Sequence, residues 1–258
     1  MFFKRDVLGI VKSIPLRFKL DNCLTLDRPN VAQITLFEHK LHRDLQICAA
    51  NVHICFNPKR GDVKLAQTIW LLSEIHRCTR ERPEIPVIIL AGDFNSASGS
   101  PLWRFICGEP LNTIRCSRTE VAMNDLCNLN IFKPMPNPLI PPQLNINKKC
   151  QFEKCSHEDT THNDKSAIYC HELGLQSLHP GDLSSFGIYE MNNAFGRYYI
   201  EVDHIFFAQG TNYSIIPSQY THYHYPHLAA INGPIPSSSN GSDHYPLFVE
   251  FILQRKTT

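Results

Sequence analysis

The stretch Ile85–Ser96, which reads Ile-Pro-Val-Ile-Ile-Leu-Ala-Gly-Asp-Phe-Asn-Ser, constrains the fold of this chain more than any other. Its apolar residues at 87–91 do not alternate with polar ones, which is typical of a strand buried on both faces. Asp93 and Asn95 follow two residues apart, so in an extended backbone both side chains point the same way, off the end of the strand. An acid and an amide in that place suit the binding of a water or a phosphate. A strand followed by a purely structural Asx turn is the alternative.

The bulk properties predict one large α/β domain over residues 1–258 and exclude some functions. A net charge of +1 gives no general attraction for nucleic acid, so any RNA contact must be local. The segment 1–6 carries charges where a signal peptide needs its apolar core, and no apolar run has the length of a membrane span. We therefore expect no membrane partner and a cytoplasmic location, with the nucleus left open. Ten cysteines without an export signal indicate reduced thiols.

The order of elements predicted up to residue 106 is β-β-α-β-α, which is an α/β pattern. Asp62 is expected to cap the first helix, which fades near Arg80, and Ser100 is expected to cap the second, with Pro101 at its first position. The predicted strands lie at 31–37, 45–53 and 87–91, and the predicted helices at 62–80 and 102–106. Two further strands are expected later, at 198–207 and 245–253.

The chain changes character between residues 111 and 180. Proline dominates 134–142, which excludes a helix or a central strand there. Residues 145–168 are polar and aperiodic, so we predict a surface insertion at about 145–180 that is partly disordered. A zinc site can be assembled on paper within it, but the spacing fits no compact zinc motif and favours a loop rich in Cys and His. The residues concerned are Cys150, Cys155, His157, His162, Cys170 and His171.

Polar residues occur at or near the ends of four predicted strands, and they define the candidate site. One such residue is usually a cap, but four coincidences in one α/β chain favour a shared cleft. The residue types match metal-assisted phosphoester hydrolysis, in which carboxylates and an amide hold the water and a divalent cation, and histidines stabilise the charge on the phosphate. The candidates are His53, Asp93, Asn95, Asp203, Asp243 and His244.

Several motifs resemble a known superfamily. Gly92-Asp-Phe-Asn-Ser96, Val202-Asp203 and Ser242-Asp-His244 are similar to signatures of the endonuclease/exonuclease/phosphatase superfamily. The stretch 51–67 resembles the branch that holds the CCR4-type deadenylases, and most closely the angel proteins. The stretches 99–106, 140–144 and 231–234 strengthen the similarity to the angel proteins, which runs over nearly the whole chain.

The resemblance implies a two-sheet α/β sandwich with its active site at the strand ends. It implies a phosphoesterase that depends on Mg²⁺, with Mn²⁺ as an alternative, and acts on RNA 3′ ends rather than on DNA. Hydrolysis of 2′,3′-cyclic phosphates and 3′–5′ exonuclease or deadenylase activity both remain open, because the shared residues do not separate them. Protein partners, oligomeric state and the exact RNA substrate are not indicated by the sequence.

The resemblance also assigns roles to individual residues. His53 would contact the scissile phosphate, Asp93 would orient or deprotonate the water, and Asn95 would position phosphate and metal. Asp203 would belong to the same phosphate and metal environment, and Asp243 would hold His244 for stabilisation of the transition state. Three basic residues beside His53 are candidates for the RNA backbone, with a solvated helix start as an equal alternative. They are Lys59, Arg60 and Lys64.

The chain departs from the family pattern at its N-terminal side. Family members carry an early Leu-Gln-Glu whose glutamate is the main metal ligand, whereas this chain has no Leu-Gln-Glu and its residues 1–5 align with a strand well inside the family domain. We therefore expect an N-terminally incomplete domain in which Asp93, Asn95 and Asp203 attract a cation only weakly. A fragment, an incomplete gene model and a degenerate RNA-binding or protein-binding adaptor all remain open. We also expect the apolar side chains of Ile10, Ile14, Leu16 and Phe18 to be partly exposed, with poor solubility and little activity as a result.

Overall fold

The computed structural model describes residues 1–122, 132–153, 167–178, 201–221, 236, 238, 241–244 and 246–257. The first half contains β1 (Leu8–Lys19), β2 (Asp27–His39), β3 (Gln46–His53), α1 (Gly61–Arg80), β4 (Val87–Asp93), α2 (Pro101–Ile106), β5 (Leu111–Asn112) and α3 (Arg118–Ala122). The second half contains the 3₁₀ turn η1 (Pro142–Leu144), β6 (Ile168–Tyr169), β7 (Gln176–Ser177), β8 (Asp203–Ala208), β9 (Tyr213–Thr221) and β10 (Phe248–Arg255).

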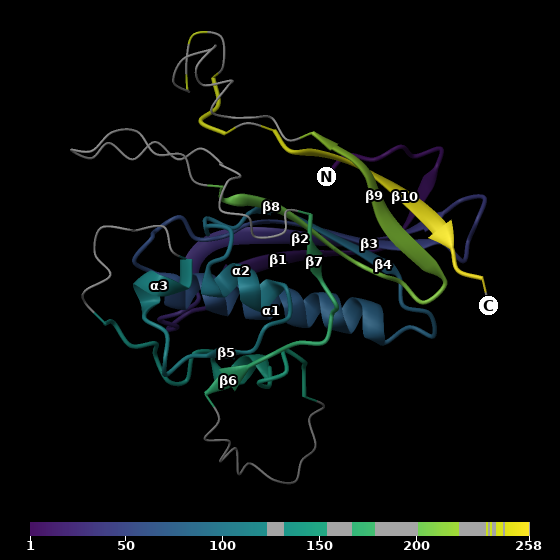
Figure 1. Cartoon of the computed structure of the whole chain (residues 1–258). Coiled ribbons are helices and arrows are strands. Elements are labelled where there is room, and N and C mark those ends of the chain that lie inside the picture. Colours follow the sequence, from purple (N-terminus) through teal and green to yellow (C-terminus); the bar gives the residue numbers. More distant parts are fainter. Residues whose placement is uncertain are drawn as a thin grey trace.

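A six-stranded sheet in the order β1-β2-β3-β4-β8-β7 forms the middle of the molecule. Only β3 and β4 run parallel, and α1 connects them. The helices α1 and α2 lie on one face of the sheet, and the two-stranded sheet β9–β10 lies on the other (Figure 1). Val87, Phe207 and Ile215 are buried together where β9–β10 packs on β4 and β8. The α/β fold predicted from the sequence is thus confirmed, as the structural comparisons below also show.

Local signals in the sequence account for most of these elements. The strand expected at 87–91 is β4, whose residues Val87, Ile88 and Leu90 are almost fully buried. Ser100 caps α2 as predicted, because its Oγ accepts a hydrogen bond from the backbone N–H of Trp103 at 3.1 Å. The stretch expected as a strand at 198–207 is described from residue 201, and β8 begins at Asp203, which is therefore its first residue rather than its middle.

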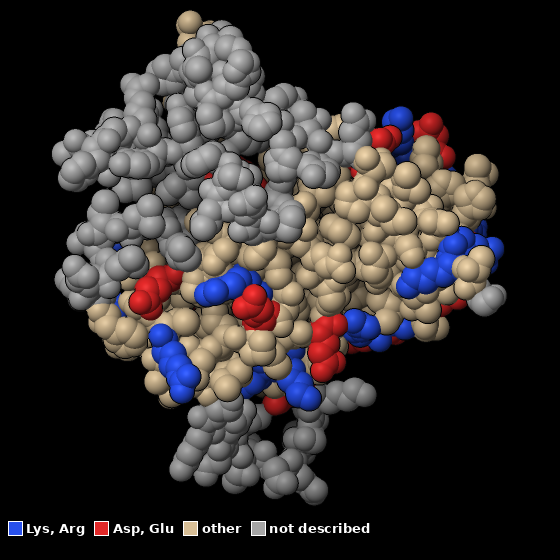
Figure 2. Space-filling view, viewed as in Figure 1, with Lys and Arg blue, Asp and Glu red and all other residues tan. Residues whose placement is uncertain are grey.

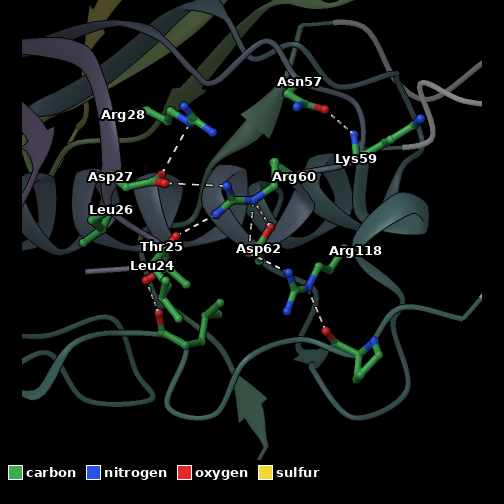
Figure 3. A network of polar contacts seen from close by, with 12 residues as sticks. Leu24, Thr25, Leu26, Asp27, Arg28, Asn57, Lys59, Arg60, Asp62 and Arg118 are labelled. Atoms are coloured by element: carbon green, nitrogen blue, oxygen red, sulfur yellow. Dashed lines mark hydrogen bonds and ion pairs between the residues drawn. The ribbon is translucent and has the colours of Figure 1, made fainter. Parts of the chain in front are cut away.

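The capping role predicted for Asp62 is wrong. Arg60 occupies the N-cap position of α1 and makes no side-chain cap. Asp62 lies buried in the first turn, where its Oδ1 is 3.0 Å from Nε of Arg60 and its Oδ2 is 3.3 Å from Nη1 of Arg118 on α3. A buried carboxylate needs such partners, and one of them, Arg118, comes from a distant part of the chain. Figure 3 shows this network, in which Arg60 also approaches Asp27.

The strand β1 was not predicted, and it corrects the expectation that its apolar residues are exposed. It pairs with β2 along most of its length, so alternate side chains reach the helix side of the sheet. Leu16 and Phe18 are buried there, and the Phe18 ring lies 5.9 Å from that of Trp70 on α1. Ile14 is partly buried against the same core, and only Ile10 is exposed as expected.

The predicted surface insertion contributes to the core wherever the structure describes it. Cys150, Tyr169, Leu173 and Leu175 are buried, and β7 closes one edge of the main sheet. The polar composition of 145–168 gave little sign of this, because Cys150 is the one buried residue described in that stretch and the others follow after residue 168. The remaining zinc candidates at 155, 157 and 162 lie outside the described residues. The eight cysteines that the structure describes are free thiols. None of the described helices is both long and apolar enough to cross a bilayer.

His171 gives a prediction about stability and pH. Its Nε2 lies 2.7 Å from the carbonyl oxygen of Phe105, and its Nδ1 faces the N–H of Leu173 at 3.4 Å, which fits a neutral ring that donates from Nε2 and accepts at Nδ1. Burial lowers the pKa of His171 from its ordinary 6.5, because the imidazolium is poorly solvated there. The unfolded chain therefore takes up the proton first as the pH falls. The folded state loses stability on acidification below about pH 6.5, by at most about 1.4 kcal/mol per pH unit.

We expect the melting temperature of a His171→Gln variant to fall less than that of the wild type when the pH is lowered from 7.5 to 5.5. The comparison uses the slope with pH, because the substitution also changes packing. His42, which is exposed, provides the control, and His42→Gln should keep the wild-type slope. An unchanged slope for His171→Gln would contradict the assignment of a buried neutral imidazole.

Candidate active site

Three adjacent strands place polar residues in one row. The pairing register sets His53 of β3 opposite Asp93 of β4, and Asp93 opposite Asp203 of β8. Gly92 makes the close approach possible, since a Cβ at this position would lie 2.0 Å from the carbonyl oxygen of Val52, and its φ is +148°. The convergence that the sequence predicted for these strand ends is therefore what the register produces.

Two carboxylate–imidazole pairs meet in this row. Nε2 of His53 lies 3.3 Å from Oδ2 of Asp93, and Nδ1 of His244 lies 2.5 Å from Oδ2 of Asp203. Asp93, Asp203 and His244 each offer a ligand atom within 4.8 Å of the others. Asp243 is placed differently from the prediction: its side chain is 73% exposed, and its Oδ1 is 4.0 Å from Nε2 of His244. Asp203 is thus the close carboxylate partner of His244 in this structure.

The electrostatics of the second pair follow from its partial burial. Burial lowers the pKa of His244, but the hydrogen bond to Asp203 and the charges of Asp203, Asp93 and Asp243 outweigh it, so the pKa of His244 is raised overall. Burial raises the pKa of Asp203, and the nearby charge of Asp93 adds to this, against the opposing hydrogen bond from His244. The pair therefore favours the protonated imidazole. Asp203 binds Nδ1 of this ring, and Nε2 is the nitrogen that does not contact Asp203.

Asn95 is fixed by contacts on every side. Its φ is +46°, in the left-handed region, and its backbone N–H donates to Oδ1 of Asp93 at 2.7 Å. Its Nδ2 donates to the carbonyl oxygen of Ile54 at 3.1 Å and lies 3.2 Å from Oδ2 of Asp93. From below, Nζ of Lys64 donates to the backbone carbonyl oxygen of Asn95. The turn that carries Asp93 and Asn95 is therefore built into the core and does not depend on a ligand.

The basic residues predicted to hold RNA are engaged elsewhere, with one exception. Lys64 is fully buried under the Asn95 turn, and burial lowers its pKa to about 8 despite the opposing charge of Asp93. Nη2 of Arg60 donates to the carbonyl oxygen of Leu24 at 2.6 Å, within the network of Figure 3. In this structure neither head group is available to a phosphate. Lys59 is exposed, and its contact with RNA stays a prediction. Figure 2 shows acidic and basic side chains interspersed on the described part of one face, in keeping with the net charge of +1.

Most of the candidate catalytic side chains line an open cleft of about 450 Å³. The volume of the cleft suits a phosphate with its ribose. Its walls carry carboxylates, an amide and two imidazoles. The described lining residues are His53, Phe56, Asp93, Asn95, Asp243 and His244. Phe56 was missed by the sequence reasoning, although an aromatic residue three positions after a candidate catalytic histidine is a signal that could have pointed to it.

The donor atoms fit a divalent cation such as Mg²⁺. Asp93 and Asp203 bring carboxylate oxygens within 4.8 Å of each other. Burial, and after it the charge of Asp93, raises the pKa of Asp203, and a cation bound between the two acids would offset both effects. Mg²⁺ is commonly bound through one or two carboxylates, with waters and substrate phosphate completing its shell. His244 is a weaker candidate ligand, because its Nδ1 is already occupied by Asp203.

The chain is similar to angel proteins along nearly its whole length. It is 28% identical to protein angel homolog 2 of Mus musculus, over 98% of this chain and 53% of the relative, and 30% identical to protein angel homolog 2 of Danio rerio, over 98% of this chain and 48% of the relative. It is 34% identical to human protein angel homolog 1 over 60% of this chain and 24% of the relative. The chain thus spans about half the length of the curated angel homolog 2 relatives. No family model matches it.

Solved structures agree with the sequence relatives. The crystal structure of ANGEL2, a 2′,3′-cyclic phosphatase, in complex with adenosine-2′,3′-vanadate matches 96% of this chain and 68% of its own with a TM-score of 0.79 at 29% identity. A second crystal structure of ANGEL2 matches at 30% identity over the same shares, with a TM-score of 0.75. The human Nocturnin catalytic domain shares the fold, with a TM-score of 0.51 at 14% identity. The chain therefore belongs to the angel family, in the CCR4 and nocturnin branch of the endonuclease/exonuclease/phosphatase superfamily.

Proposed function

We propose that this chain is a Mg²⁺-dependent phosphoesterase that hydrolyses 2′,3′-cyclic phosphates at RNA 3′ ends. The observation that carries the proposal is the meeting of His53, Asp93, Asp203 and His244 in one cleft. The similarity to a 2′,3′-cyclic phosphatase that binds an adenosine 2′,3′ ligand supports this substrate over poly(A). Removal of adenylates from 3′ ends is the competing activity of the wider branch.

The residues divide the work of hydrolysis between them. A bound Mg²⁺, held by Asp93 and Asp203, would neutralise charge on the phosphate oxygens. Asp93, at the end of β4, accepts a proton from the attacking water as its oxygen bonds to phosphorus. The bond from phosphorus to one ribose oxygen breaks, and that oxygen takes up one proton from solvent and ends as a hydroxyl, while Asp93 releases its proton to solvent. His53 contacts the same phosphate from the neighbouring strand.

His244 stabilises the charge that builds on the phosphate. Asp203 binds its Nδ1 and helps to raise its pKa, so the imidazole holds its proton more tightly than an ordinary histidine does. This leaves Nε2 to donate to a phosphoryl oxygen in the transition state, where such a bond is worth most. The placement of Asp203 thus supplies the orienting role that the resemblance gave to Asp243.

The proposal is tested with the purified chain and two RNA oligonucleotides of the same sequence, both of which end in an adenylate tract. One carries a terminal 2′,3′-cyclic phosphate and the other a free 3′ hydroxyl. We expect hydrolysis of the cyclic end in Mg²⁺ or Mn²⁺, and none in EDTA. Shortening of the adenylate tract alone would favour a deadenylase. Binding of either RNA without hydrolysis in any divalent metal would support the adaptor alternative and refute the proposed activity.

A further inference from the structure

Phe56 is an aromatic side chain exposed at the mouth of the cleft. It lies on the loop between β3 and α1, three residues after His53, and 53% of its surface is exposed. It lines the same cleft as Asp93 and His244. Its neighbours Ile54 and Cys55 are buried, so the loop turns two apolar residues into the core and one outward. A ligand that covers part of this exposed apolar surface removes it from water, which favours binding.

The backbone before Phe56 is fixed by hydrogen bonds. The N–H of Ile54 donates to the carbonyl oxygen of Asp93 at 2.9 Å, and the Ile54 carbonyl accepts from Nδ2 of Asn95. The N–H of Cys55 donates to Oε1 of Gln67 on α1, also at 2.9 Å. Ile54, two residues before Phe56, is therefore tied directly to the turn that carries the catalytic groups, and Cys55 is tied to α1.

The backbone after Phe56 is fixed as well. The N–H of Arg60 donates to the carbonyl oxygen of Asn57 at 3.1 Å, which closes a tight turn. The Arg60 side chain then joins Asp27 and Asp62, so the end of the loop is held by the ion-pair network of Figure 3. The backbone on both sides of Phe56 is thus held relative to His53 before any ligand arrives, which lowers the entropic cost of ordering this loop on binding.

We propose that Phe56 is a stacking platform for the nucleobase of the 3′-terminal nucleotide. This inference rests on the proposed function, because it requires an RNA end in this cleft. In such an end the base is joined to the same ribose as the reacting phosphate, so it must lie within one nucleotide of His53 and Asp93. Among the described lining residues Phe56 is the one apolar aromatic side chain. The other rings are the imidazoles of His53 and His244, which the proposed function assigns to the phosphate. Stacking tolerates every base, since each has a π-face, so we expect a preference for a base over none and little choice between bases.

The test measures binding in EDTA, so it does not depend on catalysis. The probes are two fluorescently labelled RNA oligonucleotides with a 3′-terminal phosphate, one with an adenine on the last ribose and one with an abasic last ribose. We expect the wild type to prefer the adenine-bearing RNA. Phe56→Ala should weaken that binding by at least about fivefold and leave the abasic RNA unchanged, while Phe56→Tyr should restore the preference. Phe132, which is 56% exposed and is not one of the described lining residues, provides the matched Phe132→Ala control.

The outcomes separate the two proposals. Base preference that is lost in Phe56→Ala, in a chain that hydrolyses nothing, would support the platform and refute the proposed hydrolysis. Hydrolysis of cyclic ends with no base preference, or an equal loss for both RNAs in a Phe56→Ala protein of normal melting temperature, would overturn the platform and leave the hydrolysis standing. Failure of the wild type to bind either RNA would overturn the platform too.

Discussion

Replacement of Asp93 by asparagine is expected to lower turnover of a 2′,3′-cyclic phosphate end by at least about 10²-fold. In the wild type the backbone N–H of Asn95 donates to Oδ1 of Asp93 at 2.7 Å. An asparagine at position 93 keeps one side-chain oxygen that can accept this hydrogen bond, so the turn should survive. It loses the basic carboxylate that takes the proton of water, and it removes half of the charge available to a cation. We therefore expect a large loss in kcat and a small change in melting temperature.

The control for this prediction is Asp243→Asn in the same cleft. Asp243 is largely exposed and lies 4.0 Å from His244, so its removal should change turnover by less than about tenfold. Both variants are assayed with saturating substrate at fixed Mg²⁺ against the wild-type rate. Near-normal turnover of Asp93→Asn would mean that the turn is structural. Equal losses in both variants would mean that Asp243 holds His244 in the working enzyme, as the family resemblance implied.

The convergence of the strand ends was predictable because it depends on regular geometry. The run at 87–91 is fully apolar and the polar residues follow at once, so the strand and its end can be read directly. His53 was predicted in the same way, as the last residue of the strand expected at 45–53. The pairing of His244 with Asp203 was not predictable, since the two residues are 41 positions apart and a sequence neighbour, Asp243, offered the simpler partner.

The start of α1 shows why burial is harder to predict than secondary structure. Lys59, Arg60, Asp62 and Lys64 fall close together, and such a cluster is ordinarily a solvated face. Three of the four are in fact satisfied inside the protein by distant groups: Asn95 for Lys64, Arg118 for Asp62, and Leu24 with Asp27 for Arg60. A single sequence gives no sign of these pairings, because they arise only when the loops before β2 and after β4 pack against the helix.

Replacement of Lys64 by alanine is expected to have the largest effect on stability of any change at the site. The Lys64 side chain is fully buried, and its ammonium group donates to the carbonyl oxygen of Asn95. Alanine would leave a cavity and a buried carbonyl without its donor, and it would remove a positive charge near Asp93. Breaking a buried charged contact from one side typically costs about 3–5 kcal/mol, against a total stability of about 5–15 kcal/mol for a domain. A surface contact with RNA, as first predicted, would instead raise KM and leave stability unchanged.

Denaturant unfolding of Lys64→Ala, Lys64→Met and Lys59→Ala separates these readings. Lys64→Met fills most of the space but restores no donor, so its loss should be smaller than that of Lys64→Ala and still exceed about 1 kcal/mol. Lys59 is exposed five positions earlier, and Lys59→Ala should stay within about 0.5 kcal/mol of the wild type. Asn95 has a left-handed backbone conformation, and its carbonyl oxygen accepts the hydrogen bond from Lys64. Folded Lys64→Met protein, which lacks this bond, should therefore also have a lower turnover number than the wild type. A stable Lys64→Ala protein with a raised KM alone would show that the side chain reaches the cleft, and that its burial beneath the Asn95 turn is not the state in which the protein works.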